Sequence, residues 1–474
     1  DRFRAVREME RESNADLELR ASWPHVHPVT DPVLAEKMAP LRQVSFDLEC
    51  YSSTGAFPNP LVPGDYIAQI GVTVQDYGCE GELRYLITCG PCNPIENTVV
   101  RVVENEAELL RVWAAFLRVV DPNVVHGFNI YGFDLPYLAR RIDVVFKDDP
   151  DSREQCMQWS VFASHRYTCE LSESNLSSGA YGDNKFFVVR TPGRLFMDLQ
   201  PLIKRDYKLK SYSLNSVAAH ILKEQKDDVT AAEMFDAFKT RDPAKIARVG
   251  KYCIKDTLLP QRIINKLNTL LTLVEMAKVT FVPLDYLVTR GQQIKILSLI
   301  AEAARKDGFL VPHVRRHSNS TAKQAGKGVV GPARAKNADK YVGATVLKPK
   351  RGTYWCPVSA LDFAALYPTT MIDWNFCYTT LIKDPRYLGI PGVEYHTIKC
   401  CGREHTFAQT TVGLLPRILR GLLRARKRAK NQMKEAKDAG DKFMESVYNC
   451  KQLALKVTCN SVYGFTGAEA VGKL

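Results

Sequence analysis

The stretch Ser45-Phe46-Asp47-Leu48-Glu49-Cys50 alternates polar and apolar side chains. Since the side chains of a strand point alternately to its two faces, this alternation predicts a strand with one apolar face turned to a core. Asp47 and Glu49 would share the other face, close enough to hold a divalent cation between them. Paired carboxylates repel unless a cation separates them, and Mg²⁺ and Mn²⁺ prefer such oxygen ligands. The alternative is an edge strand that carries two solvated surface acids.

The length and charge of the chain bound its class. Its 474 residues exceed what one hydrophobic core usually supports, so at least two domains are expected. Lysine and arginine outnumber the acids by 65 to 52, and the net charge of +13 favours a polyanionic partner such as nucleic acid. The 13 cysteines are scattered, and no secretory signal or membrane-spanning stretch is evident, which predicts an intracellular protein that is not secreted, with reduced thiols.

A second polar motif lies in the run from His126 to Leu138, which reads HGFNIYGFDLPYL and contains Asn129, Phe133 and Asp134. Its glycines allow a tight path, and an aspartate just before Leu-Pro suits the start of a helix. The alternative makes Asp134 a helix cap and Asn129 a turn residue, without any further role.

A third motif follows in the run from Val249 to Asp256, which reads VGKYCIKD. On a helix, Tyr252 and Asp256 are four residues apart and share one face. Cys253 and its apolar neighbours are expected to bury the opposite side of that helix.

These three motifs, in this order, resemble the proofreading 3′→5′ exonuclease domain of B-family DNA polymerases, of the type with four acids and a tyrosine. The run from Lys204 to Asn215 and the tripeptide Glu224-Gln225-Lys226 are similar to the delta-type replicative catalytic subunits. The resemblance implies that two divalent ions, Mg²⁺ or Mn²⁺, are held by Asp47, Glu49, Asp134 and Asp256. It further implies that Tyr252 positions the scissile phosphate or the attacking water, and that Asn129 and Phe133 hold the frayed strand.

The chemistry of phosphodiester hydrolysis also needs such residues, because two-metal hydrolysis requires a set of carboxylates to hold the ions. No Ser-His or Cys-His nucleophile arrangement is apparent, so acyl transfer has no support.

The run from Ser359 to Pro368, which reads SALDFAALYP, predicts a buried strand that delivers Asp362 and then turns at Tyr367-Pro368. It resembles the first catalytic motif of the polymerase palm. The resemblance implies that Asp362 binds the catalytic metals and that Tyr367 blocks a ribose 2′-hydroxyl. It also implies a backbone cradle for the triphosphate, made by Phe363, Ala364, Ala365 and Leu366. Ala365 and Thr369 stand where the family usually has serine, which puts a hydroxyl contact to the γ-phosphate in doubt. The alternative is an ordinary core strand with one acid.

Residues 413–463 predict a helical hairpin, with Pro416 early in the first helix and a turn at Ala439-Gly440-Asp441. The hairpin resembles the fingers of a polymerase, although a basic run is also typical of a solvated helix face. The resemblance places Arg426, Lys430 and Lys456 on the triphosphate. It places Asn460 and Tyr463 near the nascent base pair, and Gly464 where the pair packs closely.

Two other cysteine patterns leave alternatives open. Cys89-Gly90-Pro91-Cys92 has the spacing of a thioredoxin-like redox motif, although the helix that should follow is not predicted. The set His396, Cys400, Cys401 and His405 could bind zinc, although adjacent cysteines rarely fit one tetrahedron. The resemblance instead implies a plain hairpin in that second region.

The predicted fold class is therefore multidomain: an α/β RNase H-like exonuclease, a partial α+β palm and helical-hairpin fingers. The expected boundaries are residues 1–40 (remnant of an N-terminal domain), 41–270 (exonuclease), 271–340 (connecting helices and basic linker), 341–412 (partial palm) and 413–474 (fingers). Within the first of these, the charged segment from Arg2 to Arg20 predicts an exposed helix. The chain begins on Asp1, stops at Leu474 in mid-pattern and contains no Asp-Thr-Asp, the core of the second palm carboxylate motif. We therefore expect a fragment from a cell or a large DNA virus.

The function implied for the whole protein is template-directed DNA synthesis with 3′→5′ proofreading in replication. The fragment alone is expected to act as an exonuclease only. The implied partners are primer–template DNA, deoxynucleoside triphosphates, a sliding clamp and accessory subunits, with no membrane association. The implied location is the nucleus or the replication compartment of a virus-infected cell. The alternatives are a stand-alone 3′→5′ exonuclease and a non-catalytic DNA-binding scaffold.

Overall fold

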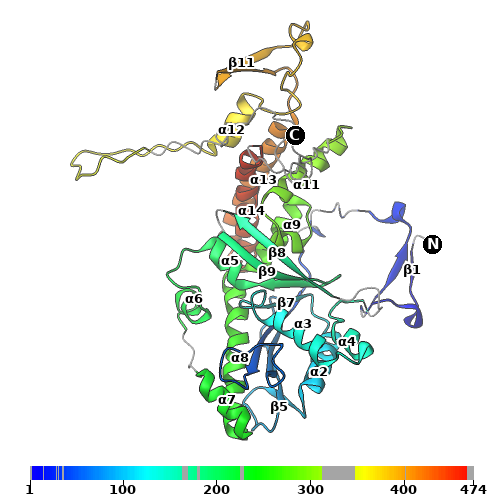
Figure 1. Ribbon diagram of the computed structural model, residues 1–474. Helices are drawn as coiled ribbons and strands as arrows, with labels where there is room; N and C mark the ends of the chain where they lie inside the picture. Colours follow the sequence, from blue (N-terminus) through cyan, green and yellow to red (C-terminus); the bar gives the residue numbers. More distant parts are fainter. Residues whose placement is uncertain are drawn as a thin grey trace, which may run out of the picture. The chain divides into compact units, whose positions relative to one another are not determined.

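The computed structural model describes residues 3–466 apart from 14, 16, 28, 30, 32, 35, 36, 163–168, 179–181, 225–228, 312–346 and 401. The chain divides into two compact units, Asp1–Leu270 and Leu271–Leu474, which are described separately. Figure 1 shows the course of the chain through its labelled elements. Among the described residues, no helix combines the length and the apolar character needed to cross a membrane.

The first unit is built on a six-stranded sheet with the strand order β10-β7-β3-β4-β5-β6. Its strands are β3 (Arg42–Tyr51), β4 (Tyr66–Asp76), β5 (Leu83–Cys89), β6 (Val99–Val103), β7 (Val124–Gly127) and β10 (Leu195–Asp198). β3, β4 and β5 pair antiparallel, whereas β6, β7 and β10 join by parallel pairing. β3 is thus an inner strand, flanked by β7 and β4, and the alternative of a solvated edge strand is wrong.

The apolar face of β3 packs into the main core, as its alternating pattern predicts. Val44, Phe46, Leu48 and Cys50 are all buried in one cluster with Trp113. That cluster includes side chains from two helices, α2 (Glu106–Val120) and α3 (Asp134–Val145). Since successive side chains of a strand alternate between faces, Asp47 and Glu49 point to the other side of the sheet.

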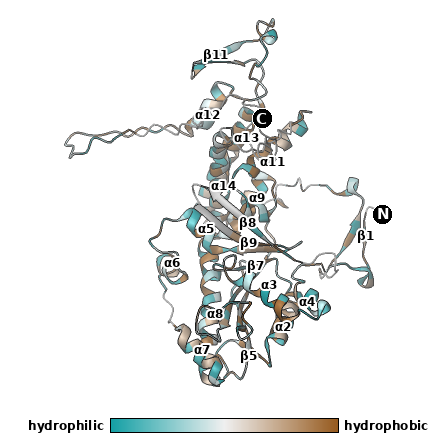
Figure 2. Cartoon of the chain, viewed as in Figure 1, coloured by the Kyte–Doolittle hydropathy of each residue, from teal (hydrophilic) through white to brown (hydrophobic). Residues whose placement is uncertain are grey.

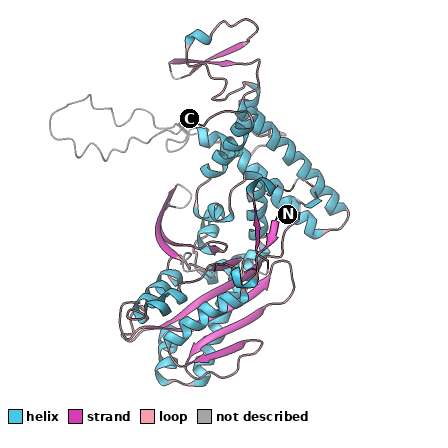
Figure 3. Ribbon diagram, turned by 90° about the vertical axis from the view of Figure 1, so that its right-hand side faces the viewer, coloured by secondary structure: helices cyan, strands magenta, loops and turns pink. Residues whose placement is uncertain are grey.

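The other face of the sheet is covered by the long helix α8 (Pro243–Lys266). Two polar contacts fasten it there: the hydroxyls of Thr73 and Thr257 lie 2.7 Å apart, and Gln69 Nε2 donates to the Ile246 carbonyl at 3.2 Å. A Cβ built on Gly250 would lie 2.5 Å from the side chain of Leu86, so this glycine allows the helix to approach closely. Helices therefore cover both faces of the sheet (Figure 3).

A buried ion pair joins the first turn of α2 to α3. Arg141 donates through Nη2 to Glu106 Oε2 at 2.5 Å and through Nε to Oε1 at 2.9 Å, and the two side chains are only 5% and 9% exposed. Glu106 Oε1 also accepts from the Ile67 N–H at 2.8 Å, and Arg141 Nη1 donates to the Pro60 carbonyl at 2.8 Å. The pair thus binds two helices, β4 and a loop together.

The remaining elements of the first unit surround this layered core. They are β1 (Phe3–Ala5), η1 (Glu8–Glu10), β2 (Leu19–Ala21), η2 (Trp23–His25), α4 (Pro150–Cys156), β8 (Glu170–Ser178), β9 (Gly182–Arg190), α5 (Leu199–Asp206), α6 (Leu214–Ile221) and α7 (Ala231–Thr240). The exposed helix predicted from Arg2 to Arg20 is wrong, because β1 and β2 pair antiparallel there. Both strands are exposed, so a helix in this segment would have gained little from packing.

The second unit is mainly helical. Its elements are α9 (Thr269–Thr280), α10 (Leu284–Thr289), α11 (Gln293–Lys306), α12 (Leu366–Asp373), η5 (Pro385–Tyr387), β11 (Tyr395–Cys400), β12 (Arg403–Ala408), α13 (Leu414–Asp438) and α14 (Lys442–Thr466). The predicted helical hairpin is confirmed as α13 and α14, with Gly440 in the turn at a φ of 74°. Both hydrophobic and hydrophilic residues occur on these helices (Figure 2), and their apolar sides share one core with α11.

Candidate functional site

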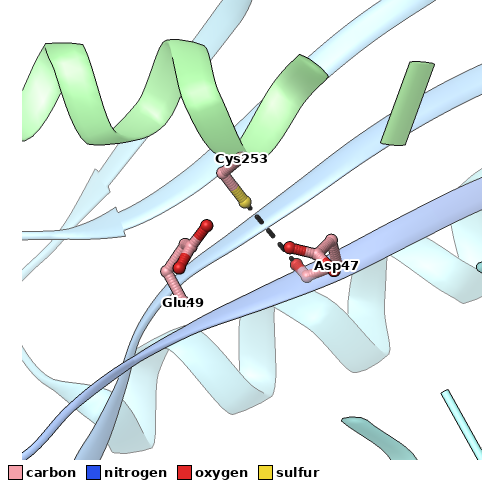
Figure 4. Close-up of side chains that lie close together, drawn as sticks. All are labelled: Asp47, Glu49 and Cys253. Atoms are coloured by element: carbon pink, nitrogen blue, oxygen red, sulfur yellow. Dashed lines mark hydrogen bonds between the residues drawn. The ribbon is translucent and has the colours of Figure 1, made fainter. Parts of the chain in front are cut away.

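Asp47 and Glu49 of β3 lie together with Cys253 of α8 beneath that helix (Figure 4). One ligand atom from each of the three side chains lies within 4.8 Å of the others. Glu49 is buried and Asp47 is half-buried, so the pair can be reached from one side. Carboxylate oxygens at this separation are the kind of ligand set that a divalent cation takes.

Asp134 is tied to the same strand from the other side of the sheet. It is the first residue of α3, and its Oδ1 accepts from the Leu48 N–H at 3.1 Å, between Asp47 and Glu49. The alternative of a helix cap is wrong, because Phe133 occupies the cap position. Burial raises the pKa of Asp134 to about 7; the Leu48 hydrogen bond opposes this, and the charges of Asp198 and Asp256 add to it.

Helix α8 brings the third motif to the carboxylate pair. Asp256 is nine-tenths buried, and its charge raises the pKa of Asp134 and of Cys253, in both cases as a smaller cause than burial. Tyr252, one turn earlier, is half-buried. Asp134 thus bonds to β3 and Asp256 acts electrostatically on Asp134 and Cys253, whereas the group of ligand atoms within 4.8 Å contains Asp47 and Glu49 but neither of these two acids.

Cys253 lies on the side of the acids, not on the opposite side of α8 as its apolar neighbours suggested. Its Sγ donates to the Asp47 carbonyl at 3.7 Å, and it packs on Gly71 of β4, where a Cβ would come within 2.6 Å of that sulfur. The spacing contained the signal, since Cys253 and Asp256 are three residues apart and share a helix face.

Asp198, at the end of β10, is a buried carboxylate for which no sequence pattern predicted a role. Its Oδ1 accepts from the Asn129 N–H at 2.8 Å and the Gln200 N–H at 2.9 Å, and its Oδ2 accepts from the Tyr131 N–H at 3.0 Å. Asn129 has a φ of 64°, which this anchoring helps to hold. Asp198 therefore sets the path of the loop that leads from β7 to Phe133 and Asp134.

Replacing Asp198 with asparagine should disturb this loop while keeping the size of the side chain. One of its two acceptor oxygens becomes a donor, so a buried N–H faces another donor, at a cost of about 1 to 3 kcal/mol. We expect the melting temperature to fall. We also expect the KM for single-stranded DNA to rise more than kcat falls, because the substitution displaces Asn129, which is proposed to hold the strand, before it displaces the acids. Asp206→Asn, an exposed acid at the end of α5, is the matched control. Equal kinetics for Asp198→Asn and the parent would remove Asp198 from this positioning role.

The segment that carries Asp362 differs from its prediction. No strand forms at residues 359–362, and Leu361 is 97% exposed. A strand needs a partner to satisfy its backbone, and none of the described strands pairs with this segment. The predicted turn at Tyr367-Pro368 is also wrong, because both residues lie in α12. The chain turns two residues before Tyr367, at Ala365, which caps the start of that helix with a φ of 56°.

Of the residues predicted to bind nucleotide, Tyr367 and Tyr463 come into contact in the second unit. The rings of Tyr367 and Tyr463 stack with centroids 4.3 Å apart and planes 10° apart. The Nε of Arg426 on α13 is buried and has no hydrogen-bond partner among the described residues. The positive charge of Arg426 acts to lower the pKa of Cys459 on α14, against the larger effect of burial, which raises it. Lys430, Lys456, Asn460 and Gly464 are exposed. The two helices thus present the cations of Lys430 and Lys456 to solvent, and Tyr463 of α14 stacks on Tyr367 of α12.

The other cysteine patterns do not form sites among the described residues. Burial raises the pKa of Cys89 to about 12 and also raises the pKa of Cys92, whereas a redox-active cysteine needs a lowered pKa. In the zinc candidate, Cys401 falls outside the described residues, and the ring of His396 stacks on Trp374 at 4.2 Å. Within the described part of the chain, the metal-ligating groups that gather in threes are Asp47, Glu49 and Cys253.

Comparison with known proteins gives two matching family models. The model described as "DNA polymerase family B, exonuclease domain" matches residues 3–217, and the model described as "DNA polymerase family B" matches residues 282–474. The first match includes Asp47, Glu49 and Asp134 but ends before Tyr252 and Asp256, and the second includes Asp362 and the α13–α14 hairpin.

The chain is also similar to DNA polymerase delta catalytic subunits. It is 39% identical to the protein of Oryza sativa subsp. japonica over 92% of this chain, 37% identical to that of Caenorhabditis elegans over 98%, and 39% identical to that of Bos taurus over 93%. These alignments cover 37%, 40% and 37% of the relatives, so the chain spans about two fifths of their length.

Proposed function

The chain belongs to DNA polymerase family B, and on this basis we propose that a protein containing it carries out template-directed DNA synthesis with 3′→5′ proofreading in DNA replication. The observation that carries the proposal is the carboxylate cluster on β3, in a chain that also contains the cation-bearing hairpin. A stand-alone exonuclease would have no use for a triphosphate site on that hairpin.

In the exonuclease site, Asp47, Glu49, Asp134 and Asp256 would hold two divalent ions, Mg²⁺ or Mn²⁺. Such ions activate a water and shield the charge on the attacking and leaving oxygens of a phosphodiester. Tyr252 would position the phosphate or the water from the helix turn before Asp256. Asn129 and Phe133 would hold the frayed strand, on the loop that Asp198 anchors.

In the nucleotide site, Asp362 would bind the catalytic metals and the backbone of Phe363, Ala364, Ala365 and Leu366 would cradle the triphosphate. Arg426, Lys430 and Lys456 would contact the phosphates; the buried Nε of Arg426 supports this role. Tyr367 would exclude a 2′-hydroxyl, with Tyr463 stacked on it, and Asn460 and Gly464 would lie near the base pair.

The chain of 474 residues, tested alone, should shorten a primer without extending it. Two-metal phosphoryl transfer needs ligands for both ions, and Asp362 is the palm carboxylate that the motifs identify in this sequence. A labelled primer–template with Mg²⁺ and deoxynucleoside triphosphates should be degraded by the parent chain and left unchanged by Asp47→Ala. Extension by Asp47→Ala would show that a second acid completes the palm site.

A protein that contains the complete palm provides the direct test of the synthetic activity. There, Asp362→Asn should abolish primer extension while hydrolysis of single-stranded DNA continues. Retained extension would refute the role of Asp362.

From the family membership, the partners of that protein would be primer–template DNA, deoxynucleoside triphosphates, a sliding clamp and accessory subunits. Its location would be the nucleus or a viral replication compartment in the host cell.

A further inference from the structure

Cys253 adds a sulfur atom to a site whose proposed chemistry uses oxygen ligands only. The thiol is buried, and its Sγ lies within 4.8 Å of a carboxylate oxygen of both Asp47 and Glu49 (Figure 4). The thiol packs on Gly71 of β4, and its Sγ donates a long hydrogen bond of 3.7 Å to the Asp47 carbonyl, a weak contact that a metal–sulfur bond could replace. The three groups come from β3 and α8, two rigid elements.

A sulfur and two carboxylates are a poor set for Mg²⁺ and a good set for a thiophilic ion. Mg²⁺ takes six oxygen ligands and keeps several of its waters. Zn²⁺ instead takes four ligands, with sulfur at about 2.3 Å and oxygen at about 2.0 to 2.2 Å, so that neighbouring ligand atoms lie about 3.3 to 3.7 Å apart. The ligand atoms of Asp47, Glu49 and Cys253 are up to 4.8 Å apart, and small side-chain rotations would bring them into that range.

We propose that Asp47, Glu49 and Cys253 form a binding site for a single thiophilic dication such as Zn²⁺ or Cd²⁺, which competes with the ions of the exonuclease site. The half-buried Asp47 provides the side of entry, and a water fills the fourth position. On binding, the Cys253 S–H bond breaks, the proton passes to solvent, and the sulfur keeps the electron pair that forms the metal–sulfur bond. The binding part stands on the ligand geometry alone; the inhibitory part rests on the proposed exonuclease function.

Titration of the DNA-free chain with Cd²⁺ tests the binding part without any activity measurement. A cadmium–thiolate bond produces an ultraviolet charge-transfer band, and calorimetry gives the affinity and stoichiometry. We expect one tight site in the parent, and loss of its band with a fall in affinity on the order of a hundredfold in Cys253→Ser. Cys169→Ser, which replaces a buried cysteine of the same unit away from the acids, is the matched control and should behave as the parent.

Two further variants make the assignment specific. Cys253→Ala should lose the same band, which covers the case in which the serine variant folds poorly. Glu49→Gln should keep the band but bind Cd²⁺ more weakly, since one oxygen ligand loses its charge. A tight site that survives in both Cys253 variants, or no tight site in the parent, overturns the proposal.

The inhibitory part is read from hydrolysis of single-stranded DNA in Mg²⁺ with increasing Zn²⁺. Each variant is compared with its own rate in the absence of Zn²⁺. Cys253→Ser should need a Zn²⁺ concentration about a hundredfold higher than Cys169→Ser for half-inhibition, in line with the expected loss of affinity. Equal sensitivity of the two variants overturns the inhibitory part. Absence of hydrolysis in every variant, with Cd²⁺ binding as expected, refutes the exonuclease function and leaves the metal site standing.

Discussion

Replacing Asp47 and Glu49 together with alanine is expected to lower the rate at which this chain degrades single-stranded DNA from the 3′ end by at least about a thousandfold. Metal ions stabilise the transition state of such hydrolysis by several kcal/mol, and about 1.4 kcal/mol corresponds to each factor of ten in rate. The variant loses two of the four acids that we propose as metal ligands, so neither of the proposed ions would keep its full set of ligands.

The fold should survive this double substitution. Two like charges held close together repel, and their removal relieves that repulsion, so the melting temperature should not fall below that of the parent. Hydrolysis of an end-labelled oligonucleotide measures the rate, and circular dichroism measures the melting. The control is Asp76→Ala, which replaces a partly exposed acid at the end of β4 that pairs with Arg42, and it should hydrolyse as the parent does. Undiminished hydrolysis by the double variant would place the active site elsewhere.

The largest expected effect on stability comes from the buried ion pair between Arg141 and Glu106. Arg141→Met should lower the free energy of unfolding of the first unit by about 3 to 5 kcal/mol, because it leaves the Glu106 carboxylate buried without its cation. Adding Glu106→Gln removes that stranded charge and keeps an oxygen for the Ile67 N–H, so the double variant should recover part of the loss.

Urea denaturation monitored by circular dichroism measures both effects. The matched control is Arg153→Met, which breaks an exposed pair with Asp143 and should cost at most about 1 kcal/mol. A double variant less stable than Arg141→Met alone would show that the cation does more than neutralise Glu106.

Short-range patterns in the sequence predicted the elements that bury an apolar face. The alternation around Asp47 predicted β3 and the common face of its two acids, and the stripe after Gly413 predicted the hairpin of α13 and α14. The two family models confirm the predicted fold class and the membership in family B.

Two of the failures have a common physical cause, because their outcome depended on groups far away in the chain. The segment before Asp362 has strand propensity but no partner among the described strands. Asp198 reads as an ordinary strand residue, and its three N–H donors become apparent only when β10 lies beside β7. The apolar neighbours of Cys253 predicted that it packs on the side of the helix opposite the acids. Its spacing of three residues from Asp256 already indicated that it lies on the same side as Asp256.

The crossing of β3 and α8 also bears on when the proposed nuclease activity can arise during folding. Asp47 and Cys253 are 206 positions apart, and closing so long a loop is among the slower steps of folding. The metal ligands of β3 meet those of α8 only once the helix has docked on the sheet. A nascent or partly folded chain would thus lack the proposed activity, and we expect the regain of hydrolysis during refolding to follow the slowest kinetic phase of the first unit.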